Sequence, residues 1–373
     1  MRFFRRLFKI FTPPPHISQK ALKEIDEEYK KTRRLIFSGI FVGYGAAYLV
    51  RKNFSLAMPY LIERGFTKGQ LGLVLTALAV AYGFSKFLMG NVSDRSNPKY
   101  FLATGLLISA AVTFILGFSN WALSSVLIMF ILMFINGWAQ GMCYPPCGRV
   151  LVHWYSIRER SFTVSILNIA HSLGGGLIGV LAILGMSIFG DWQSLFYLPA
   201  MIAALCIIYV LFTVRDTPQS VGLPSIEDYH SKKYLKKEMM KEAEKEIEEE
   251  LSAKDIFFKH IFNNKAIWFL SIANVFVYFV RFGVLDWVPT YLSEVKGFDY
   301  KNQGWAYFLY EAAAIPGVLL CGYISAKFFD SRRAPVVIIC MVLVIFAILL
   351  YWLNPPGNYL IDSIALVYTL LCS

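Results

Sequence analysis

Charged residues are scarce in this sequence. Asp, Glu, Lys and Arg make up only 16% of the 373 residues, and 57% are apolar, whereas a soluble domain carries about 25% charged residues. This composition argues against a soluble globular protein. A Gly-rich loop ending in Lys and Ser or Thr is also missing, which argues against an ATP-driven pump. We expect no cofactor and no enzymatic activity.

The cysteines are few and lack paired spacing. We therefore predict neither a disulfide nor a metal site, and we interpret the cysteines as small apolar packing residues. They are Cys143, Cys147, Cys206, Cys321, Cys340 and Cys372.

A cleavable signal peptide is not indicated, because a signal places its apolar core within the first 30 residues. Here the chain starts with Arg2, Arg5, Arg6 and Lys9, continues with three prolines, and is charged over residues 21–34. We expect the first apolar segment to stay in the protein as an anchor.

Long apolar segments are what the sequence has instead. A helix crosses ~30 Å of hydrocarbon with about 20 residues, and several segments reach that length. They predict an all-α membrane protein with about ten spans. The segments are Leu35–Val50, Leu71–Met89, Tyr100–Phe118, Ala122–Met142, Phe162–Phe189, Leu195–Val214, Ala266–Val280, Trp305–Ile324, Pro335–Trp352 and one starting at Tyr359.

The net charge of +11 lies in the loops between these segments, so we do not expect nucleic-acid binding. Alternate loops are basic, and by the positive-inside rule the N-terminus and the central loop are cytoplasmic. The basic stretches are the N-terminal tail, Ser93–Lys99, Arg149–Arg160, the central loop and Lys327–Arg333.

The polar residues 216–264 divide the chain. We predict an N-terminal tail over residues 1–34, a six-helix bundle over residues 35–215, and a second bundle over residues 265–373. Within the central loop, Lys232–Leu251 is dense in Lys and Glu at i,i+4 spacing, which favours a solvated helix or a mobile linker.

The two bundles repeat each other at an offset of 230 to 233 residues. Tyr48, Arg51 and Pro59 recur as Tyr278, Arg281 and Pro289. Two further matches pair Gly65–Gln70 with Gly297–Gln303 and Gly90–Arg95 with Gly322–Lys327. Parallel repeats of this kind are typical of secondary transporters, whose substrate binds near the midplane between the two bundles.

The repeat also predicts a truncation. At an offset of about 232, Ser373 corresponds to Gly141, so nothing corresponds to Phe162–Val214. We expect the second bundle to lack two helices and this chain to transport poorly.

Arg51 and Arg281 are the strongest functional signal. A charge inside a bilayer costs at least ~2.5–3.5 kcal/mol and marks a functional site by default. Guanidinium presents a planar fork of donors that fits phosphate oxygens in pairs. Two arginines in register across a repeat therefore predict one anion site built from two halves.

Several segments resemble the organophosphate:phosphate antiporter family of the major facilitator superfamily, and the likeness runs from about residue 24 onward. The resemblance implies two six-helix bundles in the bacterial inner membrane, a monomer, and exchange of glycerol 3-phosphate for inorganic phosphate. Hexose phosphate transport, or sensing of phosphorylated metabolites without transport, are the alternatives. The segments are Tyr48–Phe54, Ala81–Phe87, Ser93–Pro98, Tyr144–Arg149, Asp216–Ser220 and Leu285–Trp287.

His171 precedes the glycine run Gly174–Gly176, which permits close backbone approach, and imidazole titrates near neutrality. From the residues alone, a packing role and a ligand role both stay open. The resemblance implies a substrate ligand, and we expect a protonated His171 to add positive charge beside the phosphate.

Other charged and aromatic residues complete the candidate site. Lys86 lies in the second span, and Glu311 lies in its repeat counterpart. Lys52 and Asp286 follow the two arginines. These charges form breakable pairs between the bundles or fixed structural pairs, or, for Lys52 and Asp286, are simply exposed at the membrane surface. Tyr44, Tyr48 and Tyr278 either line the cavity, with Lys86 as a further substrate contact, or pack in the core.

Gly90, Asp94 and Arg95 match the superfamily's cytoplasmic loop signature. By that resemblance, Gly90 permits close helix approach, and Asp94 caps a neighbouring helix or pairs with a basic residue. The second copy has Ala326 where the family carries Asp, so it lacks the carboxylate that this cap or pair needs.

Overall fold

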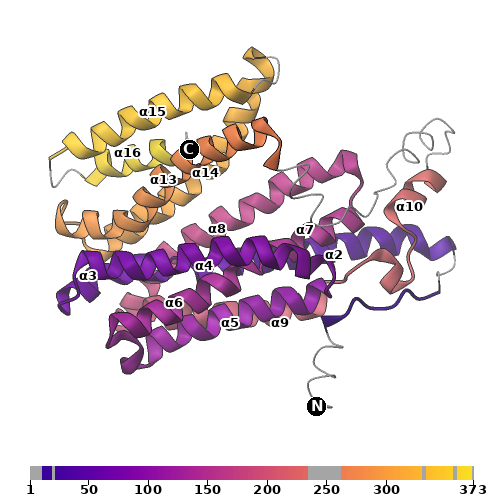
Figure 1. Ribbon diagram of the computed structural model, residues 1–373, viewed down its shortest axis with the longest axis horizontal. Coiled ribbons are helices and arrows are strands. Elements are labelled where there is room, and N and C mark those ends of the chain that lie inside the picture. Colours follow the sequence, from indigo (N-terminus) through magenta and orange to yellow (C-terminus); the bar gives the residue numbers. More distant parts are fainter. Residues whose placement is uncertain (1–10, 19–21, 234–261, 330–332, 356–358, 372–373) are drawn as a thin grey trace.

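The computed structural model describes residues 11–18, 22–233, 262–329, 333–355 and 359–371. Those residues form helices joined by short connections, and no strand occurs among them. The helices run along the long axis in two groups, with the helices numbered 13 to 16 on one side of the others (Figure 1).

The first group is the N-terminal bundle. In it α4 packs against α6, α5 against α9, and α2 against α8. Its helices are α2 (Leu22–Leu49), α3 (Asn53–Glu63), α4 (Lys68–Asp94), α5 (Pro98–Phe118), α6 (Val126–Gly141), α7 (Tyr144–Trp154), α8 (Ile157–Phe189) and α9 (Ser194–Thr213).

The second group is the C-terminal bundle, in which α14 and α15 both pack against α16. A buried ion pair joins the α13–α14 connection to α16, and a hydrogen bond joins it to α15: Lys296 Nζ lies 3.1 Å from Asp362 Oδ1 and donates to the carbonyl oxygen of Tyr351 at 3.0 Å. The helices are α13 (Lys265–Glu294), α14 (Tyr300–Phe328), α15 (Arg333–Leu353) and α16 (Tyr359–Leu371).

Local signals fix where the helices begin. Thr67 and Gln70 form a capping box at α4, and the Asn97 side chain accepts from Lys99 N ahead of α5, with Pro98 at the first helical position. Such caps satisfy amide groups that a helix start leaves unpaired.

Seven helices are long and apolar enough to cross a membrane, counting only the described residues. Each of the ten predicted segments is helical, so the prediction of an all-α membrane protein is confirmed. Large apolar side chains cover the outside, for example Phe87, Phe212 and Phe279, as expected of a surface that faces lipid. The seven are Lys68–Asp94, Pro98–Phe118, Val126–Trp154, Phe162–Phe189, Ser194–Thr213, Ile267–Glu294 and Pro335–Leu353.

The first and fourth predicted spans end within one residue of where α2 and α6 end, but each is followed directly by a further helix, which the apolar pattern did not indicate. The first break lies between Leu49 and Asn53, and the other lies between Gly141 and Tyr144. The first break holds Arg51 and Lys52, and it is central to the site.

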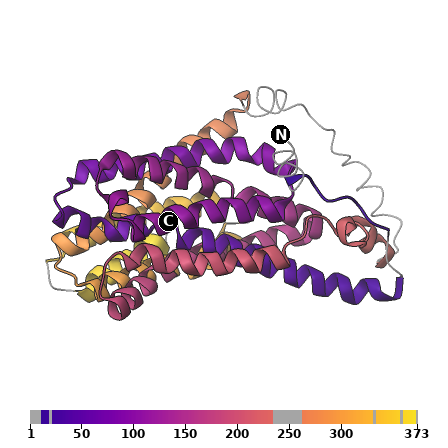
Figure 2. The same ribbon diagram turned by 90° about the horizontal axis from the view of Figure 1, so that it is seen from below.

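The start of the central loop is docked on the N-terminal bundle. The helix α10 (Ile226–Lys233) places Tyr229 on Tyr29, with ring centroids 4.1 Å apart, and the Tyr229 hydroxyl donates to Asp26 at 2.6 Å. Both views place α10 and the start of α2 at the same end of the molecule (Figures 1 and 2). The predicted linker Lys232–Leu251 lies almost wholly outside the described residues.

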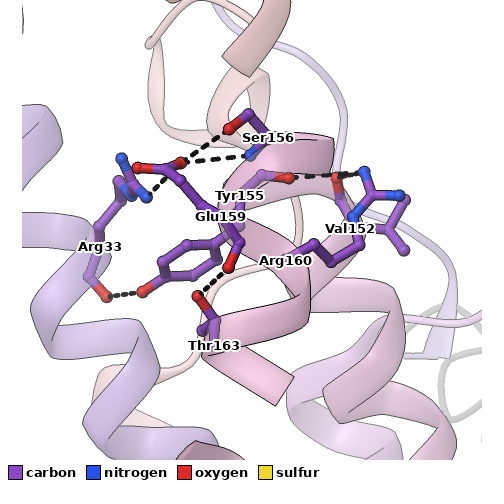
Figure 3. Close-up of polar contacts among 7 residues, drawn as sticks. All are labelled: Arg33, Val152, Tyr155, Ser156, Glu159, Arg160 and Thr163. Atoms are coloured by element: carbon purple, nitrogen blue, oxygen red, sulfur yellow. Dashed lines mark hydrogen bonds and ion pairs between the residues drawn. The ribbon is translucent and has the colours of Figure 1, made fainter. Parts of the chain in front are cut away.

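Polar contacts at this end join α2 to α7 and α8. Arg33 Nη2 donates to Glu159 Oε2 at 2.9 Å, and Tyr155 carries the Arg33 guanidinium over its ring at 4.3 Å (Figure 3). Arg149 binds Asp216 through two nitrogens, at 2.8 and 3.1 Å. The bidentate pair anchors the chain where it leaves the N-terminal bundle.

The two bundles meet most closely where α8 crosses α14. A Cβ added at Gly179 would lie 2.3 Å from the Gly304 carbonyl oxygen, and one added at Gly304 would lie 2.6 Å from that of Gly179. Such distances are far inside van der Waals contact, so only glycine fits at either position.

Candidate functional site

The break after α2 puts Arg51 between the bundles. Arg51 is 6% exposed, and its guanidinium carbon lies 3.9 Å from the centre of the Tyr82 ring and 5.3 Å from that of Tyr48. Its Nε has no hydrogen-bond partner, and no carboxylate pairs with it among the described residues. A buried cation that contacts tyrosine side chains and no carboxylate of the described residues is poised to accept an anion.

Arg281 approaches the same space from α13 in the C-terminal bundle. Its Nη2 lies 3.3 Å from Nε2 of His171 on α8. Guanidinium can only donate, so Nε2 accepts and the imidazole is neutral in this arrangement. The expected third positive charge on His171 is therefore absent here, because Arg281 occupies the nitrogen that would carry the proton.

Aromatic contacts link the two arginines. The His171 ring lies 5.2 Å from the ring of Tyr48, which in turn faces Arg51, and 6.4 Å from that of Tyr44. The run after His171 explains this closeness, because a Cβ on Gly174 would lie 2.1 Å from the carbonyl oxygen of Gly45 on α2. The prediction of close backbone approach at this glycine run is confirmed.

Lys86 stands on the neighbouring helix α4. Its Nζ lies 5.5 Å from the ring centres of Tyr82 and Tyr144, and Tyr144 in turn contacts Tyr44 at 5.4 Å. The side chain is exposed and forms no ion pair within the described residues. Lys86 is therefore near the site's aromatic wall and available to a ligand.

Lys52 and Asp286 form an ion pair between the bundles, and the Ser55 hydroxyl also donates to Asp286 at 3.3 Å. A second pair, Lys68 with Glu294, joins the bundles nearer the α3 end. The Lys52–Asp286 side chains are only 7% and 20% exposed. The bundles are thus closed together at the end that carries α3.

Glu311 is buried on α14 and points toward α8. A Cβ on Gly175 would lie 3.1 Å from its carboxyl carbon, and its Oε2 has no hydrogen-bond partner. No pair between Glu311 and Lys86 occurs in the described part of the chain. The site therefore holds Arg51, Arg281 and Lys86 against one carboxylate, an excess of positive charge that suits a phosphate monoester.

Other predicted residues lie apart from this cluster. Tyr278 is half-exposed and stacks on Phe282, whose ring centre is 4.8 Å from Lys52 Nζ, so it reaches only the edge of the site. Around Gly90 a Cβ would meet nothing within 4 Å, so no helix of the described residues approaches it closely in this arrangement.

The rest of the loop signature is also without contacts. Asp94 and Arg95 are exposed, and neither has an ion pair or side-chain hydrogen bond within the described residues. The side chain of Ala326 lies outside those described. The predicted cap or pair at Asp94 is not found in this arrangement.

Three contributors were missed from the sequence: Tyr82, Tyr144 and Phe282. Tyr82 lies four residues before Lys86, one helical turn away on the same face, and this spacing could have indicated it. Tyr144 stands in a segment that carried the family resemblance, but no local pattern singles out Phe282.

Comparisons with known proteins identify the family of this chain. The model of the Major Facilitator Superfamily matches residues 40–372. A glycerol-3-phosphate transporter of Bacillus subtilis (strain 168) is 54% identical, over 97% of this chain and 80% of that protein. A glycerol-3-phosphate transporter of Haemophilus influenzae is 46% identical, over 94% and 74%.

A membrane sensor protein of Escherichia coli, UhpC, is 32% identical, over 91% of this chain and 75% of that protein. Among solved structures, a bacterial homologue of the human lysosomal transporter Spinster superposes with a TM-score of 0.68 at 18% identity, over 92% of this chain and 74% of the other. The chain belongs to the major facilitator superfamily, and within it to the relatives of the organophosphate:phosphate antiporters.

Proposed function

We propose that this protein exchanges glycerol 3-phosphate for inorganic phosphate across the bacterial inner membrane. One observation carries the proposal: Arg51 and Arg281 come from different bundles, lack carboxylate partners among the described residues, and connect through Tyr48 and His171. The names of the Bacillus subtilis and Haemophilus influenzae relatives support glycerol 3-phosphate over hexose phosphates as the organic substrate.

The electrostatics favour exchange over one-way transport. Cations from both bundles repel one another in an empty, poorly solvated site, and an anion relieves that repulsion. Closing around phosphate or around glycerol 3-phosphate is then easier than closing empty. The two bundles alternate around a fixed site, and Lys52 and Asp286 separate when the α3 end opens.

Orientation follows from the basic residues. The α10 end carries Lys30, Lys31, Arg34, Arg149 and Arg160, and basic loops stay in the cytoplasm. We therefore place the N-terminus and α10 in the cytoplasm and α3 outside. On this orientation, the site is closed to the outside and reached from the cytoplasm.

Counterflow in proteoliposomes tests the proposal. Vesicles loaded with phosphate should take up labelled glycerol 3-phosphate, and unloaded vesicles should not. Uptake driven by hexose phosphate alone would instead assign the other substrate class. Binding of glycerol 3-phosphate without counterflow would make the protein a sensor and overturn the transport proposal.

A further inference from the structure

The helix break that carries Arg51 and Lys52 is held by side chains from two other helices. At a break, carbonyl groups lose their intrahelical donors, and buried carbonyls must find others. Here the amide of Arg51 turns to the Tyr48 carbonyl oxygen, which leaves the carbonyl of Ala47 without its usual partner four residues on.

Three buried polar residues supply the missing donors. Gln140 Nε2 donates to the Ala47 carbonyl oxygen at 2.8 Å, and Asn136 Nδ2 donates to that of Val50 at 3.2 Å. The hydroxyl of Thr113 lies 3.1 Å from the same Val50 oxygen and 2.9 Å from the carbonyl oxygen of Ser109 in its own helix, so the two carbonyls share its one hydrogen. These side chains come from α5 and α6, so the break is a tertiary feature.

The donors also bond to each other through Ser109. Its hydroxyl donates to Asn136 Oδ1 and accepts from Gln140 Nε2 at 2.8 Å. All four side chains are at most 3% exposed, and each is hydrogen-bonded to the break or to another of the four. A buried network of this kind resists displacement, because movement would leave polar groups unsatisfied.

The second bundle lacks both the break and its support. Its α13 runs unbroken from Lys265 to Glu294 through Arg281. At the repeat offset of 232, the counterparts of Ser109 and Thr113 are Met341 and Ile345, which donate no hydrogen bond to a carbonyl. Ser109 and Thr113 therefore accompany the break and not the repeat.

The break decides where two adjacent side chains point. Successive residues on a helix are about 100° apart, yet Arg51 faces Tyr82 while Lys52 reaches Asp286 in the other bundle. Both serve the space between the bundles only because the backbone departs from the helix there.

We infer that Ser109, Thr113, Asn136 and Gln140 form a polar clamp that aims Arg51 at the substrate phosphate and Lys52 at Asp286. The inference rests on the proposed function for its substrate. These are positioning residues that act through Arg51: Thr113, Asn136 and Gln140 contact the carbonyls of the break, and Ser109 bonds to Asn136 and Gln140. The clamp makes one arginine fixed, while Arg281 on its continuous helix meets the anion without such support.

Substitutions at Thr113 separate this role from packing. Thr113→Val keeps the shape and removes the hydroxyl, whereas Thr113→Ser keeps the hydroxyl and loses a methyl group. A clamp predicts that Val is the harmful change, and a packing role predicts that Ser is. Thr213, whose hydroxyl donates to the Tyr209 carbonyl in its own helix α9 at 2.7 Å, supplies the matched control pair.

Two measurements are made on the purified protein. In counterflow, Thr113→Val should raise the half-saturation concentration for phosphate several-fold, and Thr113→Val with Asn136→Leu about tenfold or more, with a smaller change in maximal rate. Thr113→Ser and both Thr213 variants should stay near wild type. Amide hydrogen exchange without substrate should quicken over residues 50–55 only in Thr113→Val and in Thr113→Val with Asn136→Leu.

The amide hydrogen exchange measurement needs no transport activity. It therefore tests the clamp even if the wild-type protein does not transport phosphate. Unchanged amide exchange in Thr113→Val, or greater harm from Thr113→Ser, would overturn the clamp. Faster amide exchange with unaltered phosphate affinity would show that the break does not aim Arg51, and would overturn the positioning role.

Discussion

Arg281 donates from Nη2 to Nε2 of His171, 3.3 Å away, and the two residues belong to different bundles. The contact places a permanent cation against a neutral ring at the boundary where the bundles move. It also leaves the remaining guanidinium donors of Arg281 free to meet an anion. The site is thus assembled by the two halves together, and each prediction below tests one of its parts.

Replacing either arginine by lysine should disable exchange. Lysine keeps the charge but cannot present two parallel donors, so Arg51→Lys and Arg281→Lys should each raise the half-saturation concentration for glycerol 3-phosphate roughly ten- to a hundredfold. Counterflow measures this, with Arg64→Lys as the control, because Arg64 lies over Trp192 away from the site. Near wild-type affinity in either site variant would refute the two-arginine site.

His171 should matter as an acceptor. His171→Gln retains an oxygen that can accept from Arg281, whereas His171→Leu does not. The affinity for glycerol 3-phosphate, measured by counterflow, should therefore fall more in the Leu variant. Acid should weaken the wild type as well, because a protonated ring cannot accept. Phosphate itself titrates near pH 6, so the pH profiles of wild type and His171→Gln must be compared. Coincident profiles would remove the histidine from the pH response.

Breaking the Lys52–Asp286 pair should be costly from either side. Asp286→Asn leaves Lys52 buried without a counter-charge, and losing one partner of a buried pair costs about 3 kcal/mol. Thermal unfolding in detergent should show this loss of stability. The double variant with the charges swapped, Lys52→Asp with Asp286→Lys, should recover part of the lost stability. Lys30→Gln, which removes an exposed pair with Asp26, should change little. Equal stability of Asp286→Asn and wild type would exclude the pair as a latch.

The Arg33–Glu159 contact should give a stability that depends on pH. Burial by itself raises the pKa of the Glu159 carboxyl, but Arg33 and the Ser156 donors outweigh it and the pKa is lowered. The pair therefore stabilises the fold above a pH of about 4.5, the ordinary glutamate value, and this contribution disappears as the pH falls through the lowered value.

Glu159→Gln should accordingly lower the free energy of unfolding by about 0.5 kcal/mol near neutrality, since the pair is partly exposed. In acid it should not change the free energy of unfolding. Melting in detergent across this range measures the difference. Thr163→Val removes the hydrogen bond to the Glu159 carbonyl, 2.9 Å long, and its effect should not vary with pH. A constant difference between Glu159→Gln and wild type would show that the carboxylate charge plays no part.

Features that depend on a single segment of the sequence were predicted well. Apolar runs located the helices, because burial in lipid selects composition directly. Arg51, Arg281 and His171 could be found because polar groups in apolar segments are conspicuous. Lys52 and Asp286 were named as a possible pair between bundles, and they form one.

Features decided by tertiary contact could not be found that way. No proline or glycine marks the break at residues 50–52; its cause lies some 60 to 90 residues later, in Thr113, Asn136 and Gln140. The docking of α10 depends on Tyr229 meeting Tyr29, and the surrounding charged residues gave no sign of it. Likewise, aromatic residues such as Tyr82 are common in spans, and only their contact with a cation sets them apart.

The crossing of α8 and α14 at Gly179 and Gly304 lies off-centre along α8. At 1.5 Å per residue, about 15 Å of helix separates Gly179 from Phe189, and about 33 Å separates it from Ile157. A rotation about this contact works as an unequal lever. The same turn that parts the bundles slightly near Phe189 sweeps the Ile157 end about twice as far, so a small opening on one face accompanies a wide closing movement on the other.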